Sequence, residues 1–237
     1  MNQKKEKIAA VVVTYNRKDF LRRCLNALLN QTYKLDSIII IDNASTDQTE
    51  EMLKKEFLNN PIFDYVKLEE NFGGSEGFHY GVKRAYEKGF DWIWLMDDDA
   101  LPLPDAMQNI VDSDISRSKN VLVLCCTVLY PNGDITLYHR RKFNWKTLSE
   151  YPIQINKYAL PYFEIDTGSF VGFLLKRDAI DEVGLPKKEF FIYYDDTEYS
   201  LRIRKIGKIY TISNSKIVHN ITTTAQRNGK LSDTSTN

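Results

Sequence analysis

The chain has 237 residues, of which 43% are hydrophobic, and its 32 basic residues equal its 32 acidic residues in number. That length and apolar content suffice for one large α/β domain with a substantial core. The balanced charge gives no basic field of the kind that attracts nucleic acid, so we expect no nucleic-acid partner. The three cysteines, Cys24, Cys125 and Cys126, lack metal-ligand spacing, which favours a reduced compartment over a disulfide framework.

The apolar runs of the sequence are too short to cross a membrane. Residues 1–7 are Met-Asn-Gln-Lys-Lys-Glu-Lys and contain no signal-peptide core. No stretch reaches the roughly 18 apolar residues that a bilayer requires. We therefore expect a cytoplasmic protein, and the sequence is compatible with peripheral attachment to the inner face of a membrane.

Apolar runs and amphipathic segments alternate from the start of the chain. Residues 8–13 form a continuous apolar run, which is typical of a parallel strand buried on both faces. Apolar residues recur at helical spacing from 18 to 30. Residues 37–41 predict a second strand, after which Ser45 and Gln48 match a capping box that opens a second helix.

Two more strand and helix units follow. Residues 64–68 predict a weaker third strand, a helix from 75 to 88 ends at Gly89, and residues 92–96 predict a fourth strand. A polar residue follows each of the four strands, at intervals of 27, 29 and 26 residues: Tyr15, Asp42, Asn71 and Asp97. This spacing is close to one βαβ repeat, and it predicts a mostly parallel, doubly wound, Rossmann-like sheet with helices on both faces.

The second half of the chain is less regular. Pro104-Asp105 opens a short helix, and strands are predicted at 121–128 and 170–175. Asn132-Gly133 between apolar flanks is a strong hairpin signal. Residues 139–162 have no clear period and predict an insertion over the site.

The last part of the chain predicts two helices and two short strands. The helices cover residues 177–182 and about 195–205, and the strands cover 209–212 and 217–218. Residues 222–237 are rich in Thr, Ser and Asn and predict a flexible tail.

Three adjacent carboxylates, Asp97, Asp98 and Asp99, directly follow the fourth strand. They repel one another unless a cation or hydrogen-bond donors share the site. Open α/β sheets bind ligands at the carboxyl ends of their strands, and Mg²⁺ or Mn²⁺ binds carboxylates together with substrate phosphates. A solvated acidic turn that merely ends the strand is the alternative. We favour a metal site that neutralises a diphosphate.

The loop after the first strand excludes two common classes of nucleotide-binding protein. Thr14-Tyr-Asn-Arg-Lys18 contains no glycine, which argues against the dinucleotide turn of NAD-binding sheets. The sequence also lacks the Gly-x-x-x-x-Gly-Lys-Ser/Thr loop of ATPases. What remains is a nucleotide whose base is read by side chains at the first three strand ends and whose diphosphate is neutralised by a metal.

Six short motifs occur in a fixed order along residues 8–219. They are Val11-Val-Val-Thr-Tyr-Asn16, Ile41-Asp-Asn-Ala-Ser-Thr-Asp47, Asn71-Phe-Gly-Gly-Ser-Glu-Gly-Phe78, Met96-Asp-Asp-Asp-Ala100, Tyr193-Tyr-Asp-Asp-Thr-Glu198 and Val218-His219. Together they resemble family 2 glycosyltransferases of the GT-A fold, and the third and fourth resemble the galactofuranosyltransferase and rhamnosyltransferase-like branch. The resemblance implies one GT-A catalytic domain over 1–221, with a nucleotide-sugar half to about residue 100 and an acceptor half over 101–221.

The resemblance implies inverting transfer of a sugar from a nucleoside diphosphate donor to a glycan or lipid-linked acceptor in cell-surface polysaccharide synthesis. A UDP-hexose such as UDP-galactofuranose is favoured as the donor. A dTDP-rhamnose-dependent rhamnosyltransferase is the alternative among enzymes. A catalytically silent sugar-nucleotide-binding protein is the alternative outside enzymes, and the joint presence of the acids described next and of His219 argues against it.

The resemblance also assigns expected roles by position. The nucleotide is expected at Thr14, Tyr15, Asn16, Arg17, Asp42, Asn43, Asn71, Gly74, Asp97 and Asp98. Asp97, Asp99 and His219 are expected to hold Mn²⁺ or Mg²⁺, although a lone histidine at a strand end is more often structural.

Inverting transfer needs a general base opposite the leaving diphosphate. Asp195 and Asp196 are the candidates, and the resemblance favours Asp196, with Glu198 as an alternative base or acceptor ligand. An aspartate at a helix start ordinarily caps the helix, so one acid of the pair is expected to cap while the other acts. The aromatic run at 190–194 is expected to exclude water from this pair.

Overall fold

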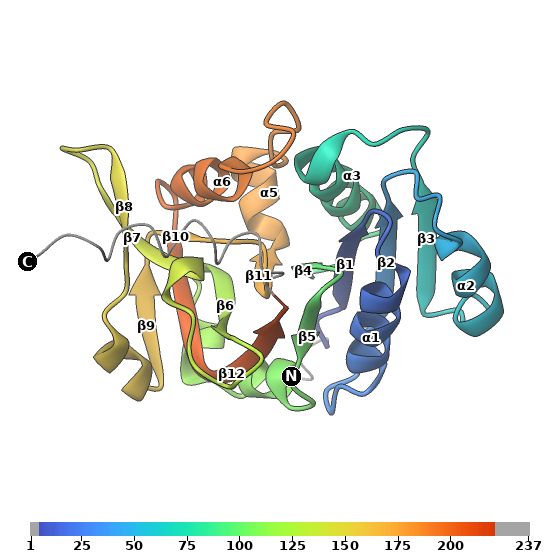
Figure 1. Cartoon of the computed structure of the whole chain (residues 1–237). Helices are drawn as coiled ribbons and strands as arrows, with labels where there is room; N and C mark the ends of the chain where they lie inside the picture. Colours follow the sequence, from blue (N-terminus) through green and yellow to red (C-terminus); the bar gives the residue numbers. More distant parts are fainter. Residues whose placement is uncertain (1–4, 221–237) are drawn as a thin grey trace, which may run out of the picture.

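The computed structural model describes residues 5–220, so the tail predicted at 222–237 lies outside the described residues. A nine-stranded sheet forms the centre of this part of the chain (Figure 1). Its strands in chain order are β1 (Ile8–Thr14), β2 (Ser37–Asp42), β3 (Phe63–Lys67), β4 (Trp92–Asp97), β5 (Ala100–Pro102), β6 (Val121–Leu129), β9 (Tyr162–Ile165), β11 (Phe173–Lys176) and β12 (Lys208–His219).

The sheet has the order β3-β2-β1-β4-β11-β6-β12-β5, with β9 also paired to β12. Strands β1 to β4 pair in parallel, and so do β6 and β12. Strand β11 lies antiparallel between β4 and β6, while β5 and β9 run antiparallel to β12. The strands therefore run mostly in one direction, as predicted, and β11 joins the two halves of the chain in one sheet.

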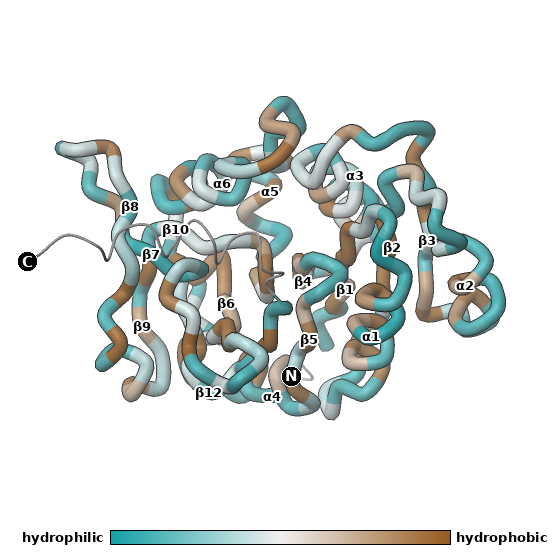
Figure 2. The backbone as a smooth tube through the Cα atoms, in the orientation of Figure 1, coloured by the Kyte–Doolittle hydropathy of each residue, from teal (hydrophilic) through white to brown (hydrophobic). Residues whose placement is uncertain are grey.

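Helices cover both faces of this sheet, as the sequence predicts. They are α1 (Lys18–Leu29), α2 (Thr49–Glu56), α3 (Gly73–Glu87), α4 (Ala106–Val111), α5 (Arg177–Val183) and α6 (Asp195–Ile203), with 3-10 turns η1 (Asp114–Arg117), η2 (Leu137–His139) and η3 (Ile155–Ala159). One core cluster contains residues of α1, α2 and α4, and the other contains residues of α3, α5 and α6. Figure 2 shows hydrophobic residues concentrated on the central strands.

The two cores follow from the alternation of side chains along each strand. Ala10 and Val12 of β1 belong to the core that contains Leu21 of α1. Val11, between them, belongs to the opposite core with Phe78 of α3. Both faces of β1 are buried, which explains its continuous apolar sequence. Among the described residues, no helix is both long and apolar enough to span a bilayer.

The predicted insertion at 139–162 forms part of a second, three-stranded sheet. Its strands are β7 (Arg140–Asn144), β8 (Ser149–Pro152) and β10 (Thr167–Gly168), in the order β10-β7-β8. Strands β7 and β8 form a hairpin that protrudes from the main body (Figure 1). The sequence missed this hairpin because its faces are mixed in polarity, so alternation is weak.

The capping box predicted at Ser45 and Gln48 is wrong. Helix α2 starts one residue after Gln48, whose backbone is left-handed (φ 67°) and whose side chain makes no cap hydrogen bond. The Ser45 hydroxyl instead accepts the backbone N–H of Asn16 at 2.8 Å. The serine therefore ties together the loops that follow β1 and β2.

Two strand predictions also need correction. The strand expected at 170–175 starts only at Phe173, because Gly172 before it adopts φ 70°. The strands expected at 209–212 and 217–218 form the single strand β12, with a register shift between Ile212 and Lys216. Ser215 lies in that irregular stretch, and its buried hydroxyl donates to the carbonyl of Ala106 at 2.8 Å, which satisfies this polar group inside the strand.

Helix α3 packs against β1 through Gly77 and Gly81, which sets the height of the helix above the sheet. A Cβ on Gly81 would overlap Cγ1 of Val11, whereas nothing lies within 4 Å of a Cβ on Gly74. We expect Gly81→Ala to lower the free energy of unfolding by about 1–3 kcal/mol through overpacking, despite the better helix propensity of alanine. Gly74→Ala is the matched control and should melt at or slightly above the wild-type temperature. Equal melting temperatures for wild type and Gly81→Ala would contradict this account.

Candidate active site

The ends of β1, β2 and β4 lie side by side at one edge of the sheet. Thr14, the last residue of β1, pairs with Asp42 of β2, and Val13 pairs with Asp97 of β4. The strand-end positions predicted from the sequence therefore converge, as expected for parallel strands.

The end of β1 and the loop after it bind two acids of the triplet directly. The Thr14 hydroxyl donates to Asp98 at 2.7 Å. The Arg17 guanidinium lies 3.1 Å from Asp98 and 2.7 Å from Asp99. Both acids are almost fully buried, so these donors compensate charges that solvent cannot reach.

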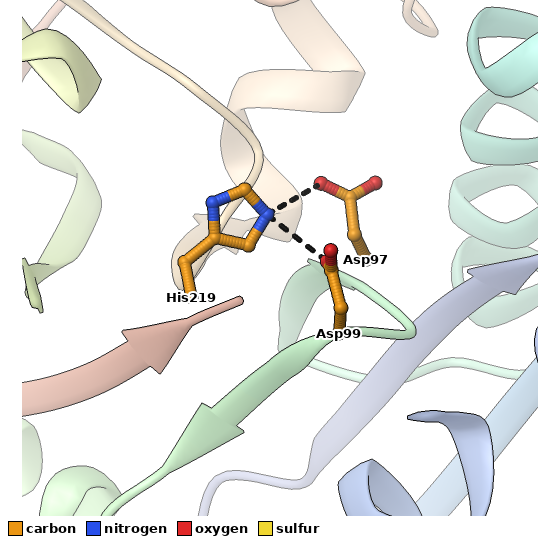
Figure 3. Close-up of side chains that lie close together, drawn as sticks. All are labelled: Asp97, Asp99 and His219. Atoms are coloured by element: carbon orange, nitrogen blue, oxygen red, sulfur yellow. Dashed lines mark ion pairs between the residues drawn. The ribbon is translucent and has the colours of Figure 1, made fainter. Parts of the chain in front are cut away.

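Asp97, Asp99 and His219 form a cluster whose ligand atoms all lie within 4.8 Å of one another (Figure 3). The antiparallel pairing of β12 with β5 brings His219 beside Ala100 and hence to the triplet. Its Nε2 is 3.0 Å from Oδ1 of Asp99 and 4.0 Å from Oδ2 of Asp97. Two acids at the junction of β4 and β5 and one histidine that is distant from them in sequence thus point at one position.

The donor set of this cluster fits a divalent cation. Oδ1 of Asp99 is buried, and among the described residues it has no partner with hydrogen-bond geometry, although the His219 ring is near. Two carboxylates and one imidazole nitrogen suit Mn²⁺ and, through the oxygens, Mg²⁺. A bound cation would occupy the lone pairs that the protein leaves free.

The surroundings shift the pKa values of the triplet acids and of His219 in different directions. Burial raises the pKa of Asp98 to about 7, against the opposing effect of Arg17. Desolvation and the charge of Asp99 raise the pKa of Asp97 to about 6, although 42% of its side chain remains exposed. Burial raises the pKa of Asp99, but His219 and Arg17 outweigh this effect and lower it. The hydrogen bond and charge of Asp99 raise the pKa of His219, although this histidine is also buried. The site is therefore short of positive charge around Asp97 and Asp98.

Asp42, expected to contact the nucleotide, is fully buried and both of its carboxylate oxygens are engaged. One accepts the backbone N–H of Ser45 at 2.8 Å, and the other accepts the hydroxyl of Tyr65 at 2.8 Å. Tyr65 on β3 is a neighbour that sequence reasoning missed, since nothing in the strand pattern distinguishes it from a packing residue. These bonds fix the Asp42 carboxylate beneath the loop that would face a base.

The remaining nucleotide candidates line the loops above these strands. Asn16 adopts φ 52°, and its side-chain oxygen accepts the N–H of Thr46 at 2.7 Å. Asn43 donates to the carbonyl of Gly73 at 3.2 Å, and the Asn71 side chain accepts the N–H of Gly73 at 2.9 Å.

Two further candidates face open space. Tyr15 is 42% exposed, and nothing lies within 4 Å of a Cβ built on Gly74. An open surface at the start of α3 and a free aromatic ring above β1 leave room for a ligand.

Asp195 and Asp196 occupy the first two positions of α6. The capping position belongs to Tyr194, which has φ 65° and makes no side-chain cap hydrogen bond, so neither acid is the N-cap. Burial and the charge of Asp196 raise the pKa of Asp195 to about 6. The charge of Asp195 in turn contributes to the raised pKa of Asp97, after burial and the charge of Asp99.

Asp196 is held from two sides. Its Oδ1 accepts the N–H of Thr197 at 2.6 Å, and its Oδ2 lies 3.6 Å from Arg141 of β7. Burial raises its pKa, and Arg141 opposes that effect. Sequence reasoning missed Arg141, because it lies in the segment without periodicity.

Glu198 forms a separate ion-pair group on α6. It lies 2.8 Å from Arg202 and 3.1 Å from Lys187. The aromatic run expected to exclude water is exposed, with Tyr193 and Tyr194 at 73% and 69%. That expectation is wrong for this structure, and the burial of Asp195 comes from other residues.

Solved structures with similar folds are glycosyltransferases of the GT-A type. One is GalNAc-T7 with UDP, GalNAc and Mn²⁺ (TM-score 0.74, 18% identity, 91% of this chain and 43% of that chain). Another is the mannosyltransferase PcManGT from Pyrobaculum calidifontis with GDP-Man and Mn²⁺ (TM-score 0.67, 17% identity, 92% and 58%). At these identities the likeness establishes the GT-A fold.

The chain belongs to glycosyl transferase family 2, whose model matches residues 9–184. It is therefore a glycosyltransferase, as the six motifs predict. A curated relative, the galactofuranosyltransferase GlfT1 of Mycolicibacterium smegmatis, is 29% identical over 206 residues, which cover 85% of this chain and 67% of that protein. The chain thus spans about two thirds of the length of this relative.

Asp98 gives a test of the electrostatics in metal-free protein. Its folded-state pKa of about 7 lies above the value of about 3.9 in an unfolded chain, so the stability that it contributes is present at low pH and is lost as pH rises from about 4 to about 7. In a chelator, Asp98→Asn should therefore have a melting temperature several degrees above that of wild type at pH 8. Each kcal/mol of added folding stability raises the melting temperature by roughly 2–4 °C in a domain of this size. The difference between the two proteins should shrink towards pH 4. A variant that melts lower than wild type at pH 8 would show that the ionised pair with Arg17 stabilises the fold.

Proposed function

We propose that the protein is an inverting, metal-dependent glycosyltransferase that transfers a hexose from a UDP-sugar, with UDP-galactofuranose as the first candidate. The observation that carries the proposal is the convergence of Asp97, Asp99 and His219, whose ligand atoms lie within 4.8 Å of one another, and a second acid pair at the start of α6 supports it. The name of the M. smegmatis relative supports the choice of sugar. The acceptor is a glycan or lipid-linked saccharide in cell-surface polysaccharide synthesis.

The nucleotide would lie over the ends of β1, β2 and β4. The loops that carry Asn16, Asn43 and Asn71 are cross-linked by hydrogen bonds to neighbouring backbone, which gives the base and ribose a rigid floor. Arg17 is already paired with the acids, so it balances their charge before any ligand arrives. A divalent cation held by Asp97, Asp99 and His219 would supply the charge that stabilises the leaving diphosphate.

Asp196 is the proposed general base. A carboxylate whose pKa is raised by burial accepts a proton more readily than an exposed one. Asp195 would add negative electrostatic potential between the base and the metal, since its charge acts on Asp97. Glu198 is less suited to either role, because Arg202 and Lys187 already neutralise it.

We also propose that the protein works in the cytoplasm. Cys24, Cys125 and Cys126 are all buried free thiols, including two adjacent ones that remain unpaired. Such thiols persist in a reducing compartment.

Donor binding should depend on a divalent cation. We expect calorimetric affinity for UDP to fall at least about tenfold, or about 1.4 kcal/mol, when Mn²⁺ is replaced by chelator, because the acid cluster repels a diphosphate. Asp99→Asn should lose most of the Mn²⁺ effect. Titration of UDP, GDP and dTDP in parallel identifies the base, and tight binding of dTDP alone would redirect the proposal to a rhamnosyltransferase. Equal affinity for UDP in Mn²⁺ and in chelator would refute the metal role.

Asp196→Asn should lower sugar transfer by about 10²–10⁴-fold while leaving UDP and Mn²⁺ affinity nearly unchanged. The amide keeps the size and the bond to Thr197 but cannot accept the proton of an acceptor hydroxyl. Asp195→Asn is the control, measured with the same UDP-sugar and acceptor. If it abolishes transfer while Asp196→Asn remains active, the base is Asp195; if the wild type binds UDP-sugar without ever transferring it, the protein is a binding protein.

A further inference from the structure

We infer that Arg141, on the β7–β8 hairpin, is a positioning residue for Asp196 that holds this carboxylate in place and in its charged form. The inference rests on the proposed role of Asp196 as the general base. It also gives the hairpin, which the family motifs do not include, a function in the reaction.

The guanidinium of Arg141 reaches three groups around the start of α6. Its Nε lies 3.3 Å from Glu150 of β8, and its Nη2 lies 3.4 Å from the hydroxyl of Thr197. The same Nη2 is 3.6 Å from Oδ2 of Asp196. A planar guanidinium can address these partners together, which a lysine ammonium cannot.

The neighbouring groups hold this arrangement from behind. Glu150 accepts hydrogen bonds from the hydroxyls of Thr197, at 3.1 Å, and Thr167, at 2.5 Å. Strands β7, β8 and β10 and helix α6 are thus linked through one carboxylate. The side chains of Arg141, Glu150 and Asp196 are each about one fifth exposed, so their charges interact with limited screening.

The distance between Arg141 and Asp196 suits a base that must remain available. At 3.6 Å the contact is too long for a strong hydrogen bond, yet close enough for charge attraction. The other oxygen of Asp196 is already occupied by the Thr197 N–H. Oδ2 therefore faces a positive charge while keeping a lone pair for an acceptor hydroxyl.

The charged groups that face Asp196 act in opposite directions. Arg141 on β7 favours the carboxylate, while Glu150 on β8 and Asp195 beside it on α6 repel it. Strand β10 contributes the neutral Thr167. Two substitutions on one hairpin should therefore move the proton affinity of Asp196 in opposite directions, which a purely structural role does not predict.

The test is a carboxyl ¹³C NMR titration of the aspartate-labelled full chain in chelator, with the Asp196 signal assigned by its loss in Asp196→Asn. We expect Arg141→Met to raise the pKa of Asp196 by about 1–3 pH units and Glu150→Gln to lower it. Lys142→Met is the matched control, because this neighbouring cation pairs with Asp166 at 3.3 Å, and it should leave the titration unchanged. Arg141→Lys should retain most of the wild-type pKa.

An unchanged Asp196 titration in folded Arg141→Met would overturn the inference, as would a rise in Glu150→Gln. If Arg141→Met does not fold, the titration of Glu150→Gln decides. With the UDP-sugar that proves active, turnover should fall off at a higher pH on the acid side of its profile in Arg141→Met than in wild type. The size of this shift should match the change in the Asp196 pKa measured by NMR. Failure to find any turnover would refute the proposed function, while the NMR titration would still decide the role of Arg141.

Discussion

Mutual repulsion among Asp97, Asp98 and Asp99 is the constraint on which the site depends. Three carboxylates stand at the end of a strand whose apolar residues are buried on both faces, so water alone cannot screen them. Arg17 balances two of them from the loop after β1, and His219 approaches from the far end of the described chain. Elements distant in sequence are brought to this edge, and each contributes charge or donors to it.

Much of this arrangement could be predicted from the sequence, because local patterns encode it. Continuous apolar runs identified the buried parallel strands, and the regular spacing of polar residues after them identified one shared edge. The acid triplet predicted a cation site because three adjacent carboxylates repel one another, with a solvated acidic turn as the alternative. The cluster with His219 was reached through the family resemblance, since a histidine beside a late strand carries no local signal of its own.

The features that were missed depend on contacts across the fold. The strand pattern identifies Tyr65 only as a packing residue. Its hydroxyl donates to Asp42 because β3 lies beside β2 in the folded chain. Arg141 lies on a hairpin of mixed polarity, and its meeting with Asp196 requires β10 to join that hairpin to α6. Ser45 satisfied a local capping rule, yet tertiary structure assigned its hydroxyl to Asn16. In each case the side chain had several local uses, and the packing of distant strands selected one.

The insertion of β11 between β4 and β6 has a consequence for synthesis of the protein on the ribosome. Strand β4 carries Trp92, Trp94 and Leu95, and its edge facing β11 has no hydrogen-bonding partner until residues 173–176 have emerged. An open, apolar strand edge is a template for pairing with other chains. The nascent first half therefore carries an aggregation-prone edge through much of translation, and slow elongation or truncation before residue 173 should favour misassembly over completion of the sheet.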